Sequence, residues 1–224
     1  MRAGRRPAAQ NEPRLRGWHA LPEPDLARPH AQTRYVVVDT ETTGLDLRRD
    51  ALIAIGAAGV DGLALRLDDC FEVLLRQDEA SADANILIHG IGGQAQLAGT
   101  DPGAGLADFL AFAGKSPLVA FRAEFDAAMV ERASLACLGI RVARRWIDLA
   151  FLLPALFPGT EARTLEDWLA AFSISAGERH HAVADALATA QLLQVALAEA
   201  DRMAMASAAD LLAMQKAQRW LGRR

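Results

Sequence analysis

Four carboxylates stand at positions in the chain that could build one site. Asp39 and Glu41 lie two residues apart, directly after the apolar run 35–38. In a strand this spacing puts both side chains on the same face of the sheet, aimed at one point. Asp126 and Asp185 are expected near the starts of helices, where an α/β fold gathers groups into a shared crevice.

Such a set indicates metal-assisted phosphoryl chemistry. Four carboxylates in one cleft cannot all stay ionised without a compensating cation, and Mg²⁺ or Mn²⁺ prefers oxygen ligands. Two such ions roughly 3.5–4 Å apart can bind the attacking and leaving oxygens of a phosphoryl transfer. His180 or His181, five and four residues before Asp185, could take the proton of an attacking water. Each acid alone is equally typical of a loop start or a helix N-terminus, so the hypothesis depends on their combination.

The pattern of apolar residues predicts the elements that must position these groups. Residues 35–38 form a continuous apolar run typical of a central strand. A second strand is expected at 51–60, and the turn signal Asp61-Gly62 leads into one or two strands over 63–75, giving an antiparallel meander. After a glycine-rich loop at 90–105, strands and helices alternate, which predicts a mixed sheet with helices on its faces. The expected later elements are strands at 117–121 and 146–148 and helices at 106–112, 123–138, 149–157, 164–172, 182–199 and 202–221.

The organisation of the chain predicts one domain with two appendages. Residues 1–33 contain five prolines and little periodicity, which predicts a flexible N-terminal arm, either mobile or loosely docked. The domain itself is expected over 34–200. Residues 201–224 form a C-terminal helical extension that either packs on the domain or docks a partner.

Composition narrows the class of protein further. Hydrophobic residues make up 52% of the 224 residues, but no apolar run approaches the ~20 residues of a membrane span. Two cysteines cannot form a disulfide framework. We therefore expect a soluble protein of the cytoplasm with no membrane partner. A formal net charge of −4 argues against binding nucleic acid through a basic patch alone, and metal ions would reverse the local sign.

Three segments in order resemble the motifs of the DEDDh family of 3′–5′ exonucleases, the type of the proofreading epsilon subunit of DNA polymerase III. The segment DTETTGL at 39–45 is similar to the first motif, AFRAEFD at 120–126 to the second and HHAVADA at 180–186 to the third. The segment IHGI at 88–91 is similar to one that lies between the first two motifs. The resemblance runs from about Tyr35 to Leu197.

The resemblance implies a fold, a ligand set and an activity. The fold is the α/β ribonuclease H-like fold, with a five-stranded mixed sheet flanked by helices. Two divalent ions, Mg²⁺ or Mn²⁺, would be held by Asp39, Glu41, Asp126 and Asp185. The family's spacing selects His180 as the general base, whereas the i, i+4 spacing of a helix would select His181. Asp39, Glu41 and His180 would then be catalytic.

The implied reaction is hydrolysis from the 3′ end of single-stranded or frayed DNA, releasing nucleoside monophosphates by a two-metal mechanism. A relative that trims RNA would share the same site. A further alternative is a module of a polymerase or repair complex that is non-catalytic or active only with its partner.

Contacts with the substrate and departures from the family pattern complete the expectations. Phe121-Arg122 stands where the family has His-Asn, Ala54 where its second strand carries an acid, and Leu149 where a threonine usually follows Asp148. Asp148 is either a cap of the following helix or a fifth acid of the site. The resemblance implies that Thr42, Thr43 and Leu45 contact the terminal nucleotide, and that His89 either borders the nucleotide cleft or has a purely structural role. Arg122 is expected to contact a phosphate of the substrate.

Overall fold

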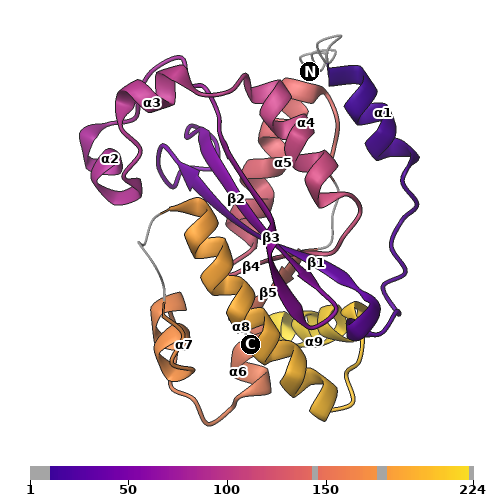
Figure 1. Cartoon of the computed structure of the whole chain (residues 1–224). Helices are drawn as coiled ribbons and strands as arrows, with labels where there is room; N and C mark the ends of the chain where they lie inside the picture. Colours follow the sequence, from indigo (N-terminus) through magenta and orange to yellow (C-terminus); the bar gives the residue numbers. More distant parts are fainter. Residues whose placement is uncertain (1–10, 143–145, 176–180, 222–224) are drawn as a thin grey trace.

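A five-stranded mixed sheet forms the centre of the molecule (Figure 1). The computed structural model describes residues 11–142, 146–175 and 181–221. The strands follow the order β3-β2-β1-β4-β5. Their bounds are β1 Arg34–Thr42, β2 Leu52–Asp61, β3 Ala64–Leu74, β4 Leu118–Ala120 and β5 Trp146–Asp148.

The predicted arrangement of the strands is confirmed. β1, β2 and β3 form an antiparallel meander, since β2 pairs antiparallel with both of its neighbours. β4 runs parallel to β1, and β5 runs parallel to β4. The carboxyl ends of β1, β4 and β5 therefore lie at the same edge of the sheet, where residues that follow these strands can meet.

Helices cover both faces of this sheet (Figure 1). The described helices are α1 Glu12–Ala20, α2 Asp83–His89, α3 Gly93–Ala98, α4 Pro102–Ala113, α5 Glu124–Leu138, α6 Leu149–Leu156, α7 Leu165–Ala171, α8 Ala182–Arg202 and α9 Ala208–Leu221, with a 3₁₀ turn, η2, at His30–Gln32. Side chains of β1 alternate between two cores: Tyr35 and Val37 pack with α6–α9, and Val36 and Val38 pack with α1, α4 and α5. We call these two sides of the sheet the α8 face and the α5 face.

The observed elements differ from the predicted ones in the glycine-rich stretch, at the start of the C-terminal helix and at α2, which lies where no helix was predicted. The glycine-rich stretch predicted as a loop contains α3, and α4 begins at Pro102 because the Asp101 side chain accepts a hydrogen bond from the Ala104 amide at 3.1 Å. The C-terminal helix begins at Ala208 instead of residue 202. Ser207 and Asp210 exchange side-chain and backbone hydrogen bonds that begin α9 there.

The described part of the N-terminal arm is docked against the domain. Leu15 and Trp18 of α1 are buried in the core of the α5 face. The Trp18 indole donates to the carbonyl of Gly114 at 2.8 Å, and the Lys115 ammonium lies 3.6 Å from the centre of its ring. An apolar side chain with a satisfied N–H and a cation on its face provides a specific dock for a short helix.

The arm and the C-terminal extension also hold each other. His30 donates its backbone amide to the carbonyl of Ala206 at 2.8 Å, and the Ala209 amide donates to the carbonyl of Leu26 at 2.9 Å. Leu211 of α9 is buried in the core of the α8 face. Of the two alternatives for the extension, packing on the domain is therefore what the structure shows. Among the described residues, no helix is long and apolar enough to span a bilayer.

Candidate active site

Three of the four predicted metal ligands meet at the carboxyl end of β1. Carboxylate oxygens of Asp39, Glu41 and Asp185 all lie within 4.8 Å of one another. Asp39 and Glu41 project from β1 onto the α8 face, and Asp185 comes from the first turn of α8, where it is only 5% exposed. The donors are all carboxylate oxygens, which suits Mg²⁺ or Mn²⁺. Their mutual repulsion would be relieved by such an ion.

A glycine on the neighbouring strand, β2, allows the start of α8 to lie close to the sheet. Gly56 of β2 is the cross-strand partner of Asp39, and Ala54 is the partner of Glu41. A Cβ atom on Gly56 would lie 2.0 Å from the carbonyl carbon of Ala182, at the start of α8. The missing side chain therefore sets the distance between α8 and β1, and with it the distance between Asp185 and Asp39.

We expect Gly56→Ala to displace the start of α8. Backbone atoms cannot move aside as a flexible side chain can, so the overpacking should cost about 1–3 kcal/mol of the free energy of unfolding. Urea denaturation measures this loss. Gly17→Ala is the matched control, since outside its own helix no described residue lies within 4 Å of the added Cβ. Equal unfolding midpoints for the two variants would contradict this role of Gly56.

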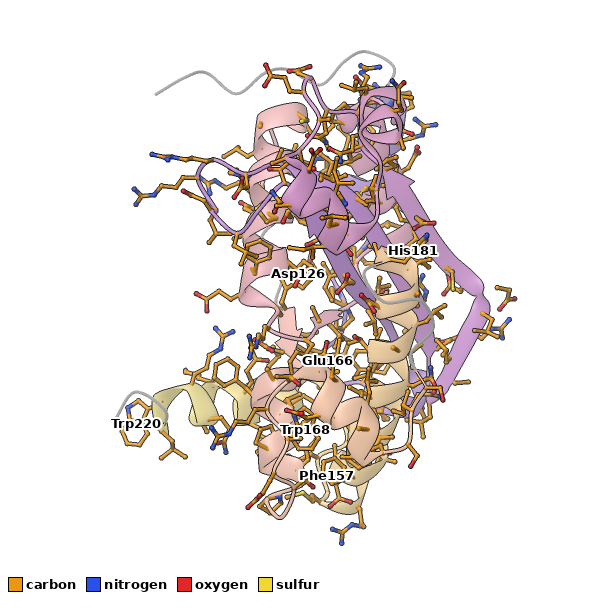
Figure 2. The ribbon with its side chains drawn as sticks, turned by 90° about the vertical axis from the view of Figure 1, so that its left-hand side faces the viewer. Asp126, Phe157, Glu166, Trp168, His181 and Trp220 are labelled. Carbon is orange, nitrogen blue, oxygen red and sulfur yellow. The ribbon has the colours of Figure 1, made fainter. Side chains whose placement is uncertain are left out.

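Asp126 reaches the site from the α5 face and is not one of the three clustered acids. It lies in the first turn of α5, 7% exposed, and its carboxylate accepts a hydrogen bond from the Thr40 hydroxyl at 2.7 Å. Thr40 stands between Asp39 and Glu41, so its side chain points to the opposite face of the sheet. Figure 2 shows Asp126 on α5 and His181 at the start of α8, with the strands between them.

Burial raises the pKa of Asp126 from its ordinary 3.8 to about 7. The Thr40 hydrogen bond opposes this shift, and the negative charge of Asp148 adds to it. In metal-free protein the neutral form of Asp126 is therefore favoured well above the range in which an exposed carboxyl group loses its proton.

The raised pKa predicts a pH dependence of stability. The contribution of the protonated Asp126 carboxyl group to the free energy of unfolding is fully present below the ordinary pKa of 3.8. It is lost as the pH rises through about 7. In EDTA, the melting temperature of the wild type should therefore fall more steeply between these values than that of Asp126→Asn, which keeps the acceptor for Thr40. Thermal unfolding at several pH values measures the difference, because the other groups titrate alike in both proteins. Parallel curves would contradict the assignment of the shift to Asp126.

The two candidate histidines differ in what the structure shows of them. His180 lies outside the described residues. His181 occupies the N-cap position of α8, and its side chain is 55% exposed. Its Nδ1 lies 3.2 Å from a carboxylate oxygen of Glu72 on β3, a residue that pairs across the strands with Gly56. The His181 ring therefore contacts a carboxylate of β3 and not one of the three clustered acids.

Asp148 caps a helix, as one of its two predicted roles requires. It ends β5, and its Oδ1 accepts hydrogen bonds from the amides of Ala150, in α6, and Arg122, at 3.0 and 2.9 Å. Burial raises its pKa, and these amides together with Arg219 oppose the shift. Asp148 thus also holds the turn that precedes α5.

The expected substrate contacts from the first motif lie beside α2. Leu45 is 83% exposed, and the Thr42 hydroxyl donates to the carbonyl of Gly44 at 2.7 Å. The Thr43 hydroxyl donates to an Asp50 carboxylate oxygen at 3.1 Å. The Asn85 side chain of α2 donates to the carbonyl of Thr43. These bonds give the loop after β1 a defined shape, with an apolar side chain exposed at its tip.

The His89 side chain at the end of α2 is bonded within the chain. Its ring is buried; Nδ1 accepts a hydrogen bond from the Ile91 amide at 3.0 Å, and Nε2 lies 3.2 Å from the Ser81 hydroxyl. Both ring nitrogens are thus engaged within the chain. His89 thus supports the turn after α2, which agrees with the structural one of its two expected roles.

Sequence reasoning missed two residues of the site. Thr40 could have been found, because the alternation that puts Asp39 and Glu41 on one face puts Thr40 on the other. Asn85 carried no local signal, since its partner is 42 positions away in the chain. Arg122, in contrast, was expected here. It follows β4 with an exposed side chain that makes no hydrogen bond or ion pair with a described residue.

The chain is similar to known exonucleases in sequence. The exonuclease family model RNase_T matches residues 36–193. The PolC-type DNA polymerase III of Clostridium perfringens is 30% identical over 166 residues, which are 71% of this chain and 11% of that protein. The Bacillus subtilis PolC-type enzyme is 30% identical over 167 residues, 74% of this chain and 12% of that protein. The chain therefore spans about a ninth of the length of these curated relatives.

Solved structures show the same fold. Exonuclease I of E. coli in complex with a dT13 oligonucleotide has a TM-score of 0.65 at 18% identity, covering 77% of this chain and 42% of that one. Exonuclease X in complex with 5′ overhanging duplex DNA has a TM-score of 0.63 at 19% identity, covering 81% of this chain and 99% of that one. Together with the family match, they confirm the ribonuclease H-like fold. The chain belongs to the exonuclease family RNase_T and is of the DEDD type of 3′–5′ exonuclease.

Proposed function

We propose that this chain is a metal-dependent 3′–5′ exonuclease acting on single-stranded or frayed DNA. The observation that carries the proposal is the convergence of Asp39, Glu41 and Asp185, whose oxygens lie within 4.8 Å of one another at the end of β1. This is an all-oxygen donor set in a chain of an exonuclease family. The proposal places the activity in the cytoplasm.

The residues of the site would have two roles, metal binding and proton transfer. Asp39, Glu41 and Asp185 would hold two divalent ions, Mg²⁺ or Mn²⁺, and Asp126 would complete the set from the α5 face. When bound, such ions would supply positive charge that offsets the negative charge developing on the attacking and leaving oxygens. His180 takes a proton from the attacking water. The water oxygen bonds to phosphorus, the bond from phosphorus to the 3′ oxygen breaks, and a nucleoside 5′-monophosphate leaves a strand with a new 3′ hydroxyl.

Recognition of the 3′ end would use the loop after β1 and the second motif. Thr42 and Thr43 would contact the terminal nucleotide, and the exposed Leu45 would pack against its base. The Arg122 guanidinium would bind a phosphate oxygen, where a charged donor gives a stronger hydrogen bond than a neutral amide. His89 is left out of this set because its ring is buried and bonded internally.

The similar proteins support DNA, and not RNA, as the substrate of this chain. Two solved structures of similar fold contain DNA, and the curated relatives are DNA polymerases. A replication or repair context, with a polymerase or repair protein as partner, is therefore part of the proposal. An RNA-trimming enzyme and a module that depends on its partner remain the two alternatives to test.

Rates on matched DNA and RNA oligonucleotides of the same sequence test the substrate. We expect faster release of monophosphates from DNA. Faster release from RNA would assign the chain to RNA trimming. No release from either substrate would favour the partner-dependent or non-catalytic alternative.

A further inference from the structure

Helix α9 is joined to the edge strand of the sheet by one side-chain amide. Among the described residues, β5 is the last strand on its side of the sheet, so it has backbone groups without a strand partner there. Gln215 is buried; its Oε1 accepts a hydrogen bond from the Asp148 amide at 2.8 Å, and its Nε2 donates to the carbonyl of Trp146 at 3.2 Å. The amide of Gln215 thus bonds β5 as a neighbouring strand would, and it fixes the backbone of Asp148.

Arg219, one turn further along α9, lies against the side chain of the same aspartate. Its Nη2 is 3.7 Å from Oδ2 of Asp148, whose side chain is only 1% exposed. Its guanidinium carbon lies 4.9 Å from the centre of the Phe151 ring on α6. A carboxylate buried to this degree needs a cation or several hydrogen bonds nearby. Arg219 supplies the cation while remaining packed on an aromatic ring.

The other oxygen of Asp148 holds the entry to α5. Arg122, whose amide donates to this oxygen at 2.9 Å, has a φ of +61°, in the left-handed region. This conformation is unfavourable for a long side chain, and it persists only where surrounding contacts hold it. Ala123 is the N-cap of α5, and Asp126 lies in the first turn of that helix. A change at Asp148 would therefore be passed to Asp126 through four residues of fixed backbone.

We propose that Gln215 and Arg219 are positioning residues of the nuclease site, which hold Asp126 in place through Asp148 and the turn at Arg122. The proposal rests on the proposed function. Without Arg219 the Asp148 carboxylate would lose its cation and the turn would relax. Because misplacement of a catalytic group by about 1 Å can cost about 100-fold in rate, the effect should be on the chemical step.

The test compares Arg219→Met, Arg219→Lys and the control Lys216→Met in the full chain. Lys216→Met removes an exposed cation from the same helix. In Arg219→Met we expect faster amide hydrogen exchange over residues 121–127. We also expect a kcat on single-stranded DNA with Mn²⁺ that is lower by about 10- to 100-fold, with KM unchanged within about twofold. Arg219→Lys should restore much of both properties, and Lys216→Met should behave as the wild type.

Two results would overturn the proposal. One is unchanged exchange over residues 121–127 in Arg219→Met, whether or not the protein cleaves DNA. The other is faster exchange with an unchanged kcat, since Arg219 would then stabilise the turn without positioning Asp126 for the reaction.

If the wild type cleaves nothing, the proposed function fails by itself. The Mn²⁺ concentration that gives half of the maximal rise in melting temperature then decides the inference. An increase of this Mn²⁺ concentration by about tenfold in Arg219→Met, absent in Lys216→Met, supports the positioning role of Arg219. No increase overturns it.

Discussion

Asp39→Asn is expected to lower the rate of 3′-end cleavage by roughly 10³-fold or more while the protein keeps its fold. Asp39 is one of three acids whose oxygens lie within 4.8 Å of one another, and it faces the start of α8 across Gly56. Removing its charge takes away a metal ligand and relieves like-charge repulsion. Initial rates with saturating Mn²⁺, and melting temperatures in EDTA, measure the two effects separately.

Asp68→Asn is the matched control for this substitution. Asp68 is an exposed carboxylate on β3 that forms an ion pair with Arg66 at 2.9 Å. Its loss should leave the cleavage rate within about twofold, because a solvated surface ion pair contributes little. The metal site would be wrongly placed if Asp39→Asn kept the rate of the control in the presence of Mn²⁺.

Substitution of the two adjacent histidines is expected to have very different effects on the cleavage rate. His180→Ala is expected to lower the rate by about 10²- to 10⁴-fold, the usual contribution of a general base. His181→Ala should change it only a few-fold, because the His181 ring is half exposed and lies 3.2 Å from Glu72. The wild-type rate should rise with pH through the range of about 6–7, where an imidazole typically loses its proton, and His180→Ala should lose this rise. Rate profiles from pH 5 to 9 for the three proteins provide the measurement.

The reverse order of effects has a definite meaning. If His181→Ala were the inactive variant, the base would come from one helical turn before Asp185, and the ring would have to leave Glu72. Equal rates for both variants and the wild type would show that neither histidine accepts the proton.

The sheet and three clustered acids could be predicted from the chain because their signals are local. The apolar run 35–38, the turn at Asp61-Gly62 and the strand-helix alternation predict the meander and the parallel strands that the structure shows. The spacing of Asp39 and Glu41 directly encodes a shared face of a strand. Asp126 reaches the end of β1 from the other face of the sheet, where it bonds to Thr40, because α5 packs on that side.

The parts that could not be predicted depend on contacts between distant residues. Trp18 bonds to Gly114 across 96 positions, and Gln215 bonds to Asp148 across 67. No periodicity in a proline-rich arm indicates such a dock, since the dock depends on a surface formed by α4. The absence of a side chain at Gly56 likewise acquires its meaning only when α8 lies over β2.

The most direct test of the central claim is digestion of a 5′-labelled single-stranded DNA. Wild type and Asp39→Asn are each incubated with Mg²⁺, with Mn²⁺ or with EDTA. We expect a ladder that shortens from the 3′ end with the wild type and a divalent ion, and intact DNA with EDTA or with the variant. Intact DNA with the wild type under both metals, or a ladder of equal strength from Asp39→Asn, would contradict the claim.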